Sequence, residues 1–182
     1  MNHDHARSSL SVPSSTQDHI EGRLDAPVVL VMYGDYQCSQ SAEVYKLIKA
    51  VQRQLSVSLG ENYLCFIFRH FPQRQIHPQA QRAAEAAEAA QDQFWQMHEM
   101  LFNFQQALGD GYLVEYANHL GLNIRQFLQA LSRGAYIDRI NQDIESGIQS
   151  GVTVAPALFI NGIRYTASWN VEQLIAAIAS DK

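Results

Sequence analysis

One apolar run that breaks at a glycine constrains this chain more than any other stretch. Residues 28–33 read Val-Val-Leu-Val-Met-Tyr, and Gly34 then leads through three further residues to Cys38. The run has no polar alternation, which is typical of a strand covered on both faces of a parallel or mixed sheet. Cys38 is therefore expected beyond the carboxyl end of a central strand, where ligands and chemistry gather in such sheets.

The residues after Cys38 have the spacing of an amphipathic helix. Apolar side chains recur at the i, i+3, i+4 and i+7 positions of one face, at Val44, Leu47, Ile48, Val51 and Leu55. Cys38 thus lies at or just before a helix N-terminus. Free backbone N–H groups and the positive end of the helix dipole favour a thiolate there, so the sulfur is expected to be nucleophilic at neutral pH.

The rest of the chain indicates a mixed α/β protein. A second buried strand is predicted over 63–68, which completes a β-α-β unit. From about 79 to 150 the apolar residues follow a helical period. A third strand over 154–160 ends in an Asn-Gly pair, the strongest signal for a two-residue hairpin, and a last amphipathic helix begins at Asn170.

This order divides the chain into three parts. Residues 1–20 are polar throughout and are expected to form a disordered N-terminal arm. Residues 21–76 and 151–182 together supply the strands of one mixed sheet. Residues 77–150 are expected to be a helical domain inserted into it, so the predicted fold class is α/β.

Composition excludes several classes of function. The net charge of -5 and the pI near 5.7 argue against nucleic acid as a partner, because phosphate binding requires clustered Lys and Arg. No apolar run reaches the roughly 18 residues of a transmembrane helix, so no membrane insertion is expected. The first residues also lack the apolar segment of a secretory signal, and we expect a cytoplasmic location.

The chain has two cysteines, Cys38 and Cys65. Cys65 falls within the second predicted strand, where we expect a buried, unpaired thiol that packs as a small hydrophobic residue. The spacing of the two cysteines matches no zinc motif and no further Cys/His pair completes four ligands, so no metal site is predicted. His3 and His5, in the polar arm, are expected to be solvated.

Seven motifs occur along the chain. They are Asp-Ala-Pro-Val at 25–28, Gly-Asp-Tyr-Gln-Cys at 34–38, Arg-His-Phe-Pro at 69–72, Ile-His-Pro at 76–78, the alanine-rich 83–90, Phe-Trp-Gln-Met-His at 94–98 and Ala-Pro-Ala-Leu-Phe-Ile-Asn-Gly at 155–162. Together they resemble the DsbA family of thiol-disulfide oxidoreductases, which have a thioredoxin fold with a helical insertion. The likeness covers about residues 18–180 and is closest to the DsbA-like domains also found fused to sodium/proton antiporters.

The family's catalytic pair is Cys-x-x-Cys, and here the four positions are Cys38, Ser39, Gln40 and Ser41. The second, resolving thiol is missing, so an oxidising equivalent cannot be stored as an internal disulfide at this place. The Cys38 thiolate can still form a mixed disulfide that another thiol releases. We expect the Ser41 hydroxyl to donate a hydrogen bond to this thiolate, and Asp35 either to tune it or to form the preceding turn.

The resemblance also implies a substrate site. Pro156 is expected to follow a cis peptide bond beside Cys38, and Ala155 to offer backbone groups to an extended substrate. Ser39 and Gln40 would border the same substrate. His70 and His77 are expected to be loop histidines with structural hydrogen bonds.

We therefore expect a DsbA-like thiol-disulfide oxidoreductase in which Cys38 and Ser41 are catalytic. Its partners would be protein or peptide thiols and disulfides, with glutathione as a candidate co-substrate and no bound cofactor. Two alternatives stay open. One is a thioredoxin-fold module that binds peptides without redox turnover, and the other is a protein similar to glutathione transferases and isomerases of this fold.

Overall fold

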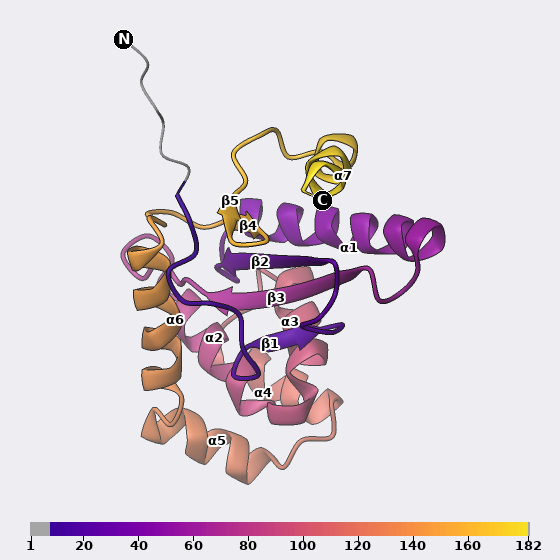
Figure 1. Cartoon of the computed structure of the whole chain (residues 1–182). Helices are drawn as coiled ribbons and strands as arrows, with labels where there is room; N and C mark the ends of the chain where they lie inside the picture. Colours follow the sequence, from indigo (N-terminus) through magenta and orange to yellow (C-terminus); the bar gives the residue numbers. More distant parts are fainter. Residues whose placement is uncertain (1–7, 182) are drawn as a thin grey trace.

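Five strands form one mixed sheet in the computed structural model, which describes residues 8–181. Their order across the sheet is β1-β3-β2-β4-β5 (Figure 1). The strands are β1 His19–Glu21, β2 Val28–Gly34, β3 Leu64–His70, β4 Ala157–Ile160 and β5 Ile163–Arg164. β2 pairs with β3 in parallel and with β4 in antiparallel, which confirms the predicted α/β fold with a mixed sheet.

Helices lie on both faces of the sheet, as the uniformly apolar β2 requires. They are α1 Ser39–Leu59, α2 Ala80–Ala89, the 3-10 turn η1 Gln91–Gln93, α3 Phe94–Asn103, α4 Asp110–His119, α5 Ile124–Arg133, α6 Ile137–Gln149 and α7 Val171–Ser180. One face packs against α1, α3 and α7, and the other against α6 and the N-terminal segment. Helices α2 to α5, which follow β3 and precede β4 in the sequence, pack on one another (Figure 1). None of the helices in residues 8–181 has the length and apolar composition needed to cross a membrane.

The Asn-Gly pair forms the expected tight hairpin between β4 and β5. Asn161 and Gly162 have φ angles of 46° and 82°, the left-handed values that such a turn requires. The Asn161 side chain also accepts a hydrogen bond from the Val29 N–H, 2.8 Å away, and so joins the turn to β2.

The N-terminal segment differs from the prediction. Residues 8–20 were expected to be disordered, but β1 pairs with β3, and the Leu10 N–H donates to the Gly162 carbonyl at 2.8 Å. Arg69 on β3 also forms a buried, two-bonded ion pair with Asp18, with N···O distances of 2.8 and 3.0 Å. Backbone hydrogen bonds and an ion pair with a residue 51 positions away attach this segment to the sheet. Neither can be recognised from the composition of the segment. His3 and His5 lie outside the described residues.

Close contact between α6 and the sheet depends on a glycine. A Cβ atom at Gly147 would lie 2.9 Å from the ring of Phe71 and 3.1 Å from that of Tyr33. Gly111 in α4 is different, because a Cβ there would meet no atom within 4 Å. An alanine at Gly147 therefore tests packing against the sheet, whereas an alanine at Gly111 tests intrinsic helix propensity alone.

We predict that Gly147→Ala lowers the free energy of unfolding by about 1–3 kcal/mol, because the added methyl group overpacks the contact with the sheet. Gly111→Ala should raise it by up to about 1 kcal/mol, since alanine is the better helix former. Urea denaturation followed by circular dichroism measures both. A Gly147→Ala protein as stable as the Gly111→Ala protein would show that α6 can move away from the sheet at little cost.

Candidate active site

The structure places Cys38 at the N-cap of α1, as the sequence predicted. Its backbone is extended, with φ −81° and ψ 118°, and its sulfur accepts a hydrogen bond from the Ser41 N–H at 3.4 Å. The sulfur therefore takes the place of the side-chain oxygen that usually caps a helix. Cys38 is 9% exposed, so only a small part of the residue is open to solvent.

The loop that precedes β4 lies next to the Cys38 sulfur. The Cys38 thiol donates to the Ala155 carbonyl, with 3.7 Å between sulfur and oxygen. The peptide bond between Ala155 and Pro156 is cis. Cys38, Ala155 and Pro156, which are far apart in the sequence, are thus brought together, while Ser39 and Gln40 are exposed at the start of α1.

Ser41 is fully buried and makes two different contacts. Its backbone N–H donates to the Cys38 sulfur, whereas its hydroxyl oxygen accepts a hydrogen bond from the Asp35 N–H at 3.2 Å. The sequence predicted that the hydroxyl would donate to the sulfur. The structure gives that role to the backbone, because the hydroxyl points back to the turn that precedes the cysteine.

Asp35, at the end of β2, joins the turn before Cys38 to the loop that follows β3. Its carboxylate is buried, and one oxygen accepts from the Gln37 N–H at 2.8 Å. The other oxygen accepts from the Gln73 N–H and lies within hydrogen-bonding distance of His77 Nδ1, both at 2.8 Å. Asp35 thus forms the turn that sequence reasoning allowed for, and it also binds the loop that follows β3.

Gln73 extends this network to the loop that precedes β4, and sequence reasoning missed it. Its side-chain oxygen accepts a hydrogen bond from the Ala155 N–H at 3.2 Å. A chain of contacts therefore runs from Asp35 through Gln73 to Ala155, which faces the Cys38 sulfur. The one available signal was position, since Gln73 is the first polar residue after the Arg-His-Phe-Pro motif.

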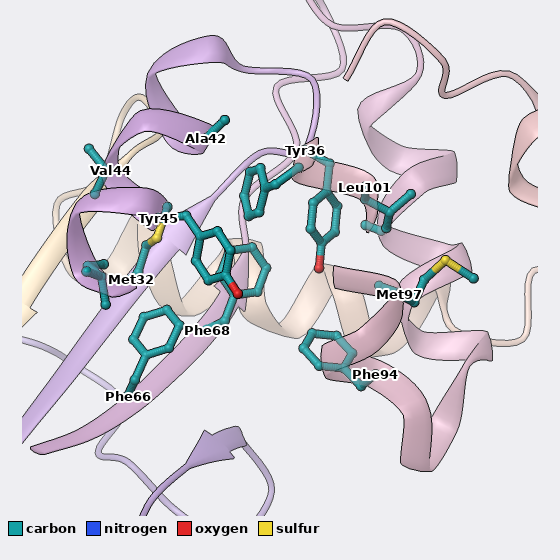
Figure 2. Close-up of a cluster of buried hydrophobic side chains, with 14 of the residues drawn as sticks. Met32, Tyr36, Ala42, Val44, Tyr45, Phe66, Phe68, Phe94, Met97 and Leu101 are labelled. Atoms are coloured by element: carbon teal, nitrogen blue, oxygen red, sulfur yellow. The ribbon is translucent and has the colours of Figure 1, made fainter. Parts of the chain in front are cut away.

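The helical segment supports the cysteine loop from the other side. The Gln105 amide donates to the carbonyls of Tyr36 and Cys38, both at 2.8 Å. Tyr36 reaches into the aromatic cluster between the sheet and α3 (Figure 2). Its hydroxyl lies 2.7 Å from His98 Nδ1. Burial raises the pKa of Tyr36 and lowers the pKa of His98, so both side chains stay neutral.

Cys65 is confirmed as a buried, unpaired thiol. It lies within β3, has no exposed surface, and is not bonded to Cys38. Burial, with a smaller contribution from the charge of Asp18, raises the pKa of Cys65 to about 11. Cys65 is therefore protonated at neutral pH and takes no part in the site.

Comparison with known proteins identifies the family. The sequence profile described as Thioredoxin matches residues 14–180, and the chain belongs to the thioredoxin family. The fold is similar to that of BdbD from Bacillus subtilis, with a TM-score of 0.81 and 19% identity over 96% of this chain and 98% of that one. Alpha-DsbA1 from Wolbachia pipientis has a TM-score of 0.78 and 18% identity over 94% and 93%. The fold is thus that of the DsbA-like proteins, as the motifs indicated.

Closer sequence relatives are much longer proteins. The chain is 37% identical over 168 residues to the Na(+)/H(+) antiporter NhaA 1 of Salinispora arenicola, a match that covers 90% of this chain and 24% of the relative. It is 33% identical to the Na(+)/H(+) antiporter NhaA of Herminiimonas arsenicoxydans, of which it covers 26%. The chain therefore spans about a quarter of the length of these relatives.

We predict that Asp35→Asn lowers the free energy of unfolding by about 1.5–3 kcal/mol, because hydrogen bonds to a buried charge are stronger than those to a neutral amide. Urea denaturation measures the loss. Asp25→Asn is the control, since Asp25 pairs with Arg23 at the surface and should give no measurable change. Equal stability of the two variants would mean that the Asp35 network contributes nothing.

Proposed function

We propose that this protein carries out thiol-disulfide exchange on protein or peptide substrates through the single thiol of Cys38. The observation that supports this most is the position of the sulfur, which caps α1 and faces the Ala155 carbonyl. A helix N-terminus stabilises negative charge, and the Ser41 N–H already points at the sulfur that would carry it. The DsbA-like fold is consistent with the same chemistry.

The reaction would consist of two exchange steps. The Cys38 thiolate attacks one sulfur of a substrate disulfide, which forms a mixed disulfide with Cys38 and releases the other sulfur as a thiolate. A second thiolate, from glutathione or from another substrate cysteine, then attacks the substrate sulfur of this mixed disulfide. It forms a new disulfide with the substrate and returns Cys38 as a thiolate. Electrons balance within the exchange, so no internal disulfide is needed.

A groove beside the site favours polypeptide substrates. Its volume is about 370 Å³ and it is lined by residues 71–76 together with Ile144 and Thr153. Ile76 and Val154 are more than half exposed at this place, which leaves apolar surface for substrate side chains. An extended peptide that bonded to the Ala155 N–H would replace Gln73 as its partner. The same groove also fits the second candidate function, a peptide-binding module without redox turnover.

The rate at which Cys38 is alkylated distinguishes thiol-disulfide exchange from peptide binding without redox turnover. We predict that iodoacetamide modifies Cys38 at pH 6 about tenfold faster than free glutathione, whose ordinary thiol is almost fully protonated there. Oxidised glutathione should then leave a single adduct, at Cys38, that an excess of thiol removes. Mass spectrometry of the wild type, Cys38→Ala and Cys65→Ala locates both modifications.

The control residue in this experiment is Cys65. With its pKa near 11 and no exposed surface, it should stay unmodified until the protein is unfolded. A slow reaction at Cys38, no faster than that of glutathione, would contradict the exchange function. Retained binding of extended peptides would then identify the protein as a binding module.

A second prediction concerns position 41, where this chain has serine in place of the second cysteine of a Cys-x-x-Cys pair. In Ser41→Cys the new thiol stands three residues after Cys38 at a helix start, a separation that a disulfide can bridge. The variant should release a glutathione adduct from Cys38 without added thiol, as its own disulfide forms, whereas the wild type should keep the adduct. Mass spectrometry over time follows the release, and an equally stable adduct in both proteins would show that the two positions cannot react.

A further inference from the structure

Three side chains of types that bind metals in proteins come from separate elements and meet beside β3, on the side away from β2. His19 comes from β1, His70 from the end of β3 and Glu88 from α2. The Nε2 atoms of His19 and His70 lie 2.6 and 2.8 Å from the same oxygen, Oε1 of Glu88. No two of these three atoms are more than 4.8 Å apart. The proposed exchange reaction uses none of them.

The surroundings fix the three side chains and leave one way in. His70 and Glu88 are buried, with 1% and 7% of their side chains exposed, but His19 is 20% exposed at the edge of the sheet. The His19 ring stacks on Phe94 with 3.5 Å between ring centroids and parallel planes. The ring of Phe94 also meets His70 edge-on. His19 is thus the most exposed of the three side chains, and an ion or a water molecule would approach from its side.

We propose that His19, His70 and Glu88 form a binding site for a divalent transition metal, and that zinc suits it best. Two imidazoles and one carboxylate, with a fourth position open to water, are a donor set that zinc uses in proteins. Ligand atoms about 2.0–2.2 Å from a tetrahedral zinc lie roughly 3.4 Å apart. The two nitrogens need to move closer together and the carboxylate oxygen to move back, each by a small side-chain adjustment.

Metal binding would change the positions of two protons. A carboxylate oxygen can only accept, so each Nε2 that faces Glu88 carries a proton there. That nitrogen must be free of its proton to bind a metal, and in the complex the ring proton is on Nδ1. Nδ1 of His70 is buried and has no hydrogen-bond partner among the described residues, so a proton there would be unpaired and would lower the affinity for the metal. The bound metal would join β1 and α2 to β3, and we expect it to stabilise the fold.

Zinc titration of the chelator-treated protein tests the proposal. Cys38, His3 and His5 are replaced by alanine in all samples, so that the thiol and the N-terminal histidines cannot bind the ion. We expect one equivalent of zinc to bind by calorimetry and to raise the unfolding temperature. Cobalt(II) should give visible absorption bands typical of a site with nitrogen ligands and low coordination number.

Two variants and one control variant show whether these residues form a metal site or only a cluster of hydrogen bonds. Glu88→Gln keeps an oxygen acceptor of the same shape but removes the anionic ligand, and His19→Ala removes one imidazole ligand at the edge of the sheet. Each should weaken zinc binding by more than about tenfold. His119→Ala, which removes an exposed histidine from α4, should leave it unchanged. The absence of saturable binding, or equal affinity in Glu88→Gln, would overturn the proposal.

Discussion

The geometry of the site depends on the hydrogen bonds that the buried carboxylate of Asp35 accepts. A charge removed from water is tolerated in a protein only when hydrogen bonds surround it, and breaking one partner leaves an energetic penalty rather than a neutral gap. Asp35 receives the backbone N–H groups of Gln37 and Gln73 together with the ring of His77. The cysteine loop and the loop after β3 therefore cannot move apart without exposing that charge. Through Gln73 the same constraint reaches Ala155, opposite the Cys38 sulfur.

The inserted helices hold the other side of the same loop. Gln105 binds the carbonyls of Tyr36 and Cys38, and the rings of Phe68, Phe102 and His98 pack around the Tyr36 ring. The sulfur is thus fixed from the sheet side by Asp35 and from the helical side by this aromatic cluster. In the proposed exchange, a sulfur held in this way would lose little conformational freedom when a substrate binds, which is the advantage of a preorganised site.

Local signals account for the parts that the sequence could predict. The apolar run of β2, the periodicity of α1 and the Asn-Gly turn each depend on neighbours in the chain, so their residues indicate them directly. β1 was missed because three residues at a sheet edge pair through their backbone. Gln73 was missed because its contacts with Asp35 and Ala155 span 38 and 82 positions. The cluster of His19, His70 and Glu88 is hidden for the same reason, since only the folded chain brings β1 and α2 to the end of β3.

Ser41 connects the chemistry of the site to its stability. The hydroxyl oxygen accepts the buried Asp35 N–H, a hydrogen bond worth on the order of 1 kcal/mol in a folded protein. A thiol at the same position is a much weaker acceptor and would leave that N–H poorly satisfied. The serine therefore stabilises the turn that carries Asp35 while it removes the resolving thiol. The exchange that we propose through Cys38 alone and a firmly held cysteine loop would then both follow from one residue, Ser41.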